Sequence, residues 1–261
     1  MKHLRNLSLI CCLVLSACNG EPVDFTAEVV NSSTLDSVTA DQLILRASIV
    51  QYNDREEADV EVVILDDASK DQIRFDQGEI IEAGAGSDLA NDDSEVDYVA
   101  LDEDYEFYDP IFSIFYEANV GGKIAKASNV DEVYFIRYTD KDENSTFTVM
   151  SRGSVSDILT PAANAELSGD SVEITWNPEE TLGDVYLYIK WEDEEGEQAQ
   201  LLDTENTGSY ELDISEMDGS GSIQLRTLDS FQSNDPGFDF DEIDLRLTSI
   251  AELAIADFHA D

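Results

Sequence analysis

The feature that most constrains this fold is the alternation of apolar and polar residues in short runs. Val172, Ile174 and Trp176, for example, alternate with Glu173 and Thr175. A period of two is typical of strands with one buried face. The chain has no run with clear helix start and stop signals, so we predict an all-β protein. The apolar positions of the other runs are Leu43, Leu45, Ala47 and Ile49; Val60, Val62 and Ile64; Phe112, Ile114 and Tyr116; Tyr134, Ile136 and Tyr138; Val185, Leu187, Ile189 and Trp191; Tyr210, Leu212 and Ile214; and Ile223 and Leu225.

Glycine-containing stretches separate these runs and predict the connections between strands. Residues 84–88 are expected to form a loop, Gly121-Gly122 a hairpin and residues 219–222 a turn. Residues 151–154 and then Thr160-Pro161 indicate a domain boundary. We therefore expect two antiparallel β-sandwich domains, a β-rich one over residues 23–156 and a second over residues 157–261.

The second domain resembles a known family. Residues 171–178, which read SVEITWNP, are similar to the second strand of fibronectin type III domains, where a tryptophan ends an alternating strand and a proline follows. Pro161 with residues 167–169 is similar to the first strand, and residues 184–190 and 207–212 are similar to the third and fifth strands. One departure is Ile223, which stands where the family usually has a tyrosine in its sixth strand. The resemblance therefore implies the wider immunoglobulin-like class, whose domains have about 100 residues.

The amino terminus reads as a secretory signal. Lys2 and Arg5 precede an apolar stretch over residues 7–15 that is too short to span a bilayer, which needs about 20 residues. Residues 15–18, Leu-Ser-Ala-Cys, resemble the lipobox of bacterial lipoproteins; the alternative is an ordinary signal peptide with a chance cysteine. The resemblance implies that residues 1–17 are removed, that Cys18 carries covalent lipid, and that residues 18–22 are a tether.

The second residue of the processed chain, Asn19, suggests the outer membrane, because an aspartate at that position is the signal for inner-membrane retention in the enterobacterial rule. Lipid on Cys18 would make the membrane the first partner of this protein, since two or three acyl chains anchor a protein durably. The sequence does not say whether the body would face the periplasm or the cell surface.

Charge and cysteine content exclude several functions. The chain carries 14 basic and 59 acidic residues, a net charge of −45, and loss of Lys2 and Arg5 with the leader gives 12 − 59 = −47. Such a charge repels nucleic acid and anionic lipid and favours a saline habitat, where salt screens it. Cys11 and Cys12 leave with the leader and Cys18 is lipidated, which excludes disulfides and cysteine catalysis in the body.

Catalytic motifs are scarce. His259, the third residue from the end of the sequence, is the one histidine beyond the leader, and a catalytic triad needs a firmly held histidine. We find no phosphate-binding glycine loop, and pairs of carboxylates carry no information among 59 acids. The sequence therefore predicts that the protein is not an enzyme.

Two kinds of binding site are candidates. Calcium takes six to eight oxygen ligands, and two acidic runs could supply them; the alternative is that these runs are solvated loops. Tyr186 and Tyr188 alternate with the apolar positions of their run and could stack on a sugar ring or a partner protein; alternatively they are covered or pair across strands. The candidate calcium ligands are Asp140, Asp142, Asn144, Asp235, Asp239 and Asp241.

These observations predict a lipid-anchored, acidic envelope protein with a structural, adhesive or assembly role, whose partner is another envelope protein. The alternative is a lipoprotein that binds a glycan or calcium.

Overall fold

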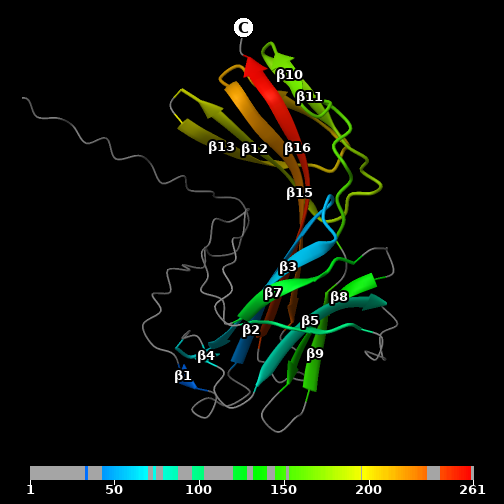
Figure 1. The fold of residues 1–261 in the computed structure, drawn as a ribbon, viewed down its shortest axis with the longest axis vertical. Helices are drawn as coiled ribbons and strands as arrows, with labels where there is room; N and C mark the ends of the chain where they lie inside the picture. Colours follow the sequence, from blue (N-terminus) through cyan, green and yellow to red (C-terminus); the bar gives the residue numbers. More distant parts are fainter. Residues whose placement is uncertain are drawn as a thin grey trace, which may run out of the picture.

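In the computed structural model the described part of the chain is all-β, as predicted (Figure 1). It covers residues 33–34, 43–69, 73–74, 79–87, 96–102, 120–127, 132–139, 145–150, 153–194, 196–233 and 242–259. Its strands are β1 (Ser33–Thr34), β2 (Leu43–Tyr52), β3 (Glu57–Asp66), β4 (Ile73–Arg74), β5 (Ile80–Ser87), β6 (Val99–Ala100), β7 (Val120–Ala125), β8 (Glu132–Thr139), β9 (Ser145–Met150), β10 (Ala165–Ser168), β11 (Ser171–Thr175), β12 (Asp184–Asp193), β13 (Gly196–Thr204), β14 (Ser209–Asp213), β15 (Asp218–Ser233) and β16 (Glu242–His259).

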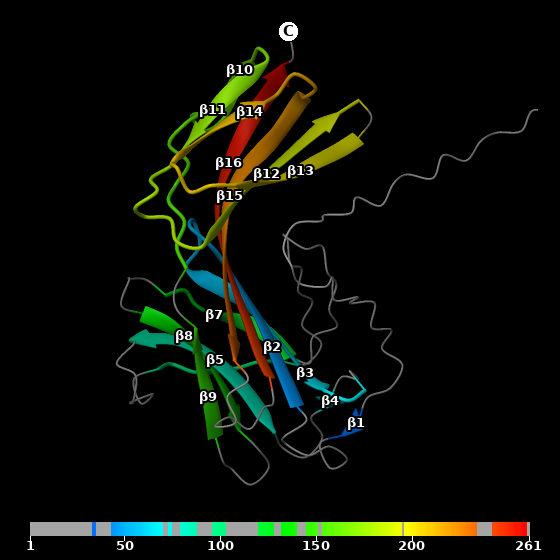
Figure 2. The same ribbon diagram turned by 180° about the vertical axis from the view of Figure 1, so that it is seen from behind.

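One long sheet runs through the whole molecule. Its strand order is β13-β12-β15-β16-β2-β3-β7, and β10 also pairs with β16. Strands β15 and β16, with 16 and 18 residues, form an antiparallel hairpin that passes from one half of the molecule into the other (Figures 1 and 2). The start of β16 pairs with β2 in parallel, from Glu242 opposite Ile44 to Ile250 opposite Tyr52, and its end pairs in parallel with β10.

A smaller sheet packs on each half of the long one. The four-stranded sheet β6-β5-β8-β9 faces the half that contains β2, β3 and β7, and the pair β11-β14 faces the half that contains β12 and β13. The apolar positions of the described alternating runs contribute to the two cores, as period two requires. The run at Phe112, Ile114 and Tyr116 lies outside the described residues. Examples are Val62, Ile64 and Tyr134 in the first core and Leu187, Ile189 and Trp176 in the second.

The last strand belongs to both sandwiches. Ile243, Leu245 and Leu247 lie in the first core, whereas Ile255 and Phe258 lie in the second. Residues near the expected boundary at 156/157 do lead into the second sandwich, but residues 242–249 return to the first. The two halves are therefore joined by main-chain hydrogen bonds of a shared sheet as well as by a connecting segment.

The predicted glycine turns are wrong, because the described residues of all three stretches lie within strands; Asp88 lies outside the described residues. Gly84 and its neighbours end β5, Gly121-Gly122 lies in β7, and residues 219–222 lie in β15. A β-carbon added at Gly84 would come within 2.8 Å of the carbonyl oxygen of Asp97. One added at Gly221 would collide with the carbonyl oxygen of Lys190, at a place where the register of β15 shifts. These glycines permit close approach of another backbone, which is the other common reason for glycine in a strand.

The fibronectin-like assignment of the second sandwich stays a prediction. The tryptophan that suggested it, Trp176, is buried just after β11, and its indole Nε1 donates to Oδ1 of Asn206 at 2.9 Å.

Candidate functional site

Most of the predicted site residues lie outside the described residues. These are Cys18, the first acidic run (Asp140, Asp142, Asn144) and the second (Asp235, Asp239, Asp241). Within the part of the chain that the structure describes, no group of three or more histidine, cysteine or acidic residues is placed to hold a metal ion. The same part contains no helix long and apolar enough to cross a membrane.

Tyr186 and Tyr188 lie on the face of the long sheet that points away from the second core, and both are half-buried. The guanidinium of Arg226 lies 3.9 Å from the centre of the Tyr188 ring, a cation–π contact. Arg226 is only 1% exposed, and its Nε and Nη2 both donate to Oε1 of Gln224. One face of Tyr188 is therefore occupied by a side chain of the protein itself.

A second cation–π contact lies nearby on this face. Tyr52 lies in one row with Ile250 and Arg226, and the guanidinium of Arg55 stacks on its ring at 3.8 Å. Burial raises the pKa of Tyr52, although the charges of Arg55 and Arg226 act in the opposite direction. The Tyr52 hydroxyl therefore stays neutral at physiological pH.

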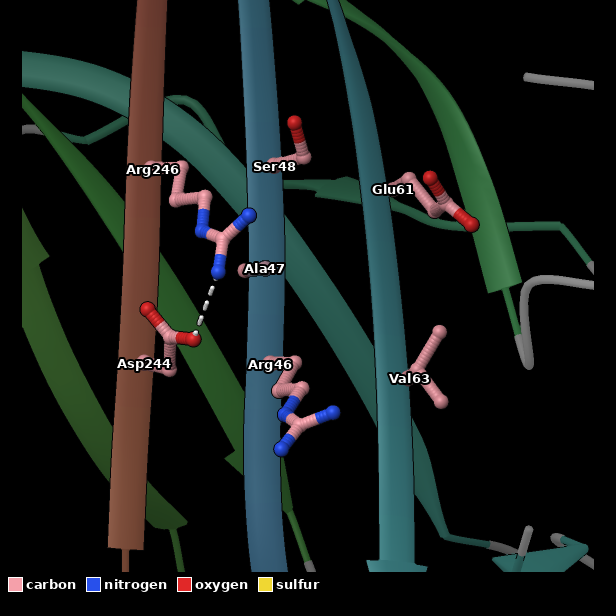
Figure 3. Close-up of a pocket in the computed structure, with 7 residues that line it drawn as sticks. All are labelled: Arg46, Ala47, Ser48, Glu61, Val63, Asp244 and Arg246. Carbon is pink, nitrogen blue, oxygen red and sulfur yellow. Dashed lines mark hydrogen bonds and ion pairs between the residues drawn. The ribbon is translucent and has the colours of Figure 1, made fainter. Parts of the chain in front are cut away.

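Further along this face lies a group of charges, of which the two carboxylates are buried and the two arginines half-buried (Figure 3). Asp244 and Arg46 share one row of the sheet, and Arg246, Ser48 and Glu61 share the next. Arg246 Nη2 lies 3.3 Å from Asp244 Oδ2, and Glu61 is 2% exposed. Two guanidiniums and two carboxylates give formal neutrality, which lowers the cost of burying them.

The cavity among these charges is small. It measures about 30 Å³ and is lined by the residues drawn in Figure 3. Sites for organic ligands usually measure about 300–1,000 Å³, so this one has room only for water or a small ion. No histidine or cysteine lines it. The group suits a role in fixing the strand register.

Sequence reasoning missed this face, although a signal was present. Four of the eight arginines of this acidic chain lie on it or stack against it: Arg46, Arg55, Arg226 and Arg246. Three of them alternate with core residues in their strands. The period of two could therefore have placed them together on the opposite face of the sheet.

Models of known protein families were compared with this chain, and none matches it. A comparison with curated proteins likewise gives no match. The function must therefore be argued from the residues and their arrangement.

A buried polar network holds the junction between the two sandwiches. The Tyr134 hydroxyl donates to Gln51 Oε1 at 2.6 Å and accepts from the Ala127 amide at 3.1 Å. Gln51 Nε2 donates to the Gly153 carbonyl at 2.9 Å and to Ser249 Oγ at 2.6 Å. The network thus ties strands β2, β8 and β16 to the segment that enters the second sandwich.

An acidic side chain lies beside this junction. A β-carbon added at Gly153 would lie 2.5 Å from Oδ2 of Asp229, and one at Gly183 would lie 2.9 Å from its Oδ1. Two glycines therefore make room for this carboxyl. Burial, and after it the charge of Asp184, raises the pKa of Asp229. The ionised form is therefore held there at a cost.

The lone histidine of the body is exposed. His259 ends β16, and its Nδ1 lies 3.9 Å from Asp218 Oδ1, with both side chains about two-thirds exposed. A contact this long between two exposed side chains contributes little to stability.

Proposed function

We propose that this protein is a lipid-anchored, non-catalytic structural or assembly module of a bacterial envelope. The observation that carries the proposal is the hairpin β15–β16, which is shared by both sandwiches. Domains joined only by a linker move relative to one another by default. A shared sheet with a satisfied polar network at its junction favours one stiff body, which suits a spacer or display role.

The anchor of this body is the lipid proposed on Cys18. The tether over residues 18–22 and the residue Asn19 support placement at the outer membrane, as argued from the sequence. A durable anchor at one end and a stiff body beyond it are the two properties that such a module needs.

Anchoring is tested by Cys18→Ser. We expect this variant to leave the membrane fraction, because the thiol that carries the lipid is gone. Cys12→Ser is the matched control, since it removes a cysteine of the leader and keeps the lipobox. If Cys18→Ser still fractionates with membranes, the lipoprotein proposal is wrong.

Stiffness is tested by distances between two spin labels in the Cys18→Ser background, which leaves the body without other cysteines. Labels at the exposed positions Ala68→Cys, just after β3, and Ala162→Cys, just before β10, place one label on each sandwich. We expect one narrow distance distribution, as narrow as that of the control pair Ala162→Cys and Ala199→Cys within the second sandwich. A broad or double distribution for the first pair alone would contradict a stiff body.

Glycan binding through Tyr186 and Tyr188 is the second candidate. Its support is that both rings lie on an outer face and keep part of their surface exposed. A glycan screen with Tyr188→Ala tests it, and binding that the variant leaves unchanged would remove the stacking role. Calcium binding by the acidic runs is a separate proposal, and its test appears in the Discussion.

A further inference from the structure

Strand β13 lies at one end of the long sheet, and its outer edge pairs with no other described strand. Strand β13 pairs with β12 over nine residue pairs without a bulge, from Thr204 opposite Val185 to Gly196 opposite Asp193. Among the described strands, β12 is its one partner, and β13 lies at the end of the sheet in both views (Figures 1 and 2). Its other edge presents main-chain N–H and C=O groups, which are a template for a further strand.

Strand β13 lacks several of the usual protections of an edge, although it carries two charged residues. Strand β13 contains no proline and no lysine, and its register with β12 is regular. By contrast, β7 at the opposite end of the sheet has six residues, of which two are glycines and one is Lys123. Strand β13 is therefore the longer and more regular of these two edges.

The side chains along this edge indicate the chemistry of a partner. On the face away from the core, Glu197, Ala199, Leu201 and Asp203 follow one another at a spacing of two. Glu197 and Asp203 are exposed, and Glu197 is only loosely paired with Lys190 at 3.8 Å. An added strand would thus meet acids at both ends of a short apolar stretch.

A second copy of this chain is a poor occupant. Antiparallel pairing of two β13 strands centred on Gln200 would place Glu197 opposite Asp203 of the other copy, twice. Like charges directly opposite one another destabilise a strand pair, and each copy also carries a net charge of −45. The charges along this edge disfavour self-pairing.

A partly exposed apolar surface of the second sandwich lies beside this edge. The long sheet contributes β12 and β13 here, whereas the opposite sheet has only β11 and β14. Leu202 and Trp191 consequently pack against the core but stay partly exposed. A strand added to β13 would cover part of this surface, which adds burial of apolar area to main-chain hydrogen bonds.

We propose that the free edge of β13 docks an extended, basic segment of a partner protein by strand addition. The segment has the pattern basic–x–apolar–x–apolar–x–basic, so that its basic residues face Glu197 and Asp203 and its apolar residues face Ala199 and Leu201. The pattern is symmetric and fits either strand direction. In this mode, main-chain hydrogen bonds give affinity and alternate side chains give specificity.

The probe is a fluorescein-labelled peptide, Lys-Thr-Val-Thr-Val-Thr-Lys with blocked ends, titrated with the full chain in detergent at about 0.15 M salt, where the Debye length is about 8 Å. We expect saturable binding by anisotropy. The double variant Glu197→Lys/Asp203→Lys should weaken it at least tenfold and should bind the peptide in which Glu replaces Lys. Hydrogen exchange at residues 196–204 should slow when the basic peptide binds.

Two controls separate strand addition from general attraction to an acidic protein. The double variant Glu173→Lys/Glu211→Lys makes the same charge change on two exposed, paired positions of β11 and β14, and it should leave the affinity within twofold. The peptide Lys-Pro-Val-Pro-Val-Pro-Lys keeps the charge but lacks alternate N–H donors, and it should bind at least tenfold more weakly.

The proposal is overturned if the basic peptide does not bind, if both double variants weaken it equally, or if exchange in β13 is unchanged. This inference rests on the assembly role proposed above, but the two fail separately. Loss of peptide binding with normal membrane release of Cys18→Ser would remove the docking edge and leave the anchored module in place.

Discussion

At the scale of single residues, the structure contains charges that cost stability and charges that add to it. Asp229 is half-buried at the junction, next to Asp184, and its pKa is raised, first by burial. Asp213 is exposed, and hydrogen bonds from the hydroxyl and the amide of Ser215 lower its pKa. Their contributions to stability therefore have opposite dependence on pH.

The first prediction concerns Asp229→Asn. Because the folded state raises the pKa of Asp229, its contribution to stability is fully present below the unfolded pKa of about 3.9 and is lost as pH rises through the folded pKa. Replacing it with a neutral amide should therefore raise the melting temperature at pH 7. The gain in unfolding free energy should be less than about 1 kcal/mol, because solvent screens a half-exposed group. The gain should disappear near pH 3.

The matched control is Asp213→Asn, for which we expect the opposite change in stability. Because the folded state lowers the pKa of Asp213, its contribution to stability is present at pH values above the unfolded pKa. This contribution is lost as the pH falls through the folded pKa. This variant should melt at a lower temperature than the wild-type protein at pH 7. Melting curves at both pH values check the pair, and a stabilised Asp213→Asn would show that the assignment of causes is wrong.

At the scale of the strand, the alternating pattern predicted most of what was observed. The runs at Leu43, Val60, Tyr134 and Val185 all became strands with the apolar positions inside. The pattern could not show that β15 and β16 extend through both sandwiches, because the pairing partners of a strand are set by long-range contacts. Nor could the pattern distinguish a glycine in a turn from a glycine that allows a neighbouring segment of backbone to approach closely. The candidate sites were predicted less well, since the arginine-bearing face was overlooked.

The second prediction tests the role of glycine in β15. Gly221→Ala should destabilise the protein, because the new methyl group would meet the Lys190 carbonyl oxygen and lie 2.9 Å from the Phe258 ring. Overpacking of this kind usually costs about 1–3 kcal/mol. Ser222→Ala, at the next position, is the control and should change the denaturant midpoint little. Equal midpoints for the Gly221→Ala variant and the wild-type protein would contradict the close approach.

At the scale of the whole molecule, the net charge of −45 and the shared sheet have opposite effects on the stability of the folded state. Self-repulsion opposes a compact state, whereas the shared sheet and the two cores hold it. Salt should therefore matter for this protein more than for a neutral one.

The third prediction is that the melting temperature rises smoothly with sodium chloride up to about 1 M, where the Debye length falls to about 3 Å. Calcium chloride at matched ionic strength separates screening from binding. A saturating rise at sub-millimolar calcium would favour specific sites in the acidic runs, because a ligand of the native state stabilises it by RT ln(1 + [L]/Kd). Equal melting curves in the two salts would instead favour a solvated acidic surface.

The central claim is that the two sandwiches form one cooperative body, and one measurement tests it most directly. Both tryptophans of the chain, Trp176 and Trp191, lie in the second sandwich, whereas Leu245 is fully buried in the first core. Leu245→Ala should cost about 2–5 kcal/mol, and we expect the tryptophan fluorescence transition to shift to lower temperature together with the circular dichroism signal. If fluorescence melts at the wild-type temperature while circular dichroism shows an earlier, separate step, the two sandwiches unfold independently and the account is wrong.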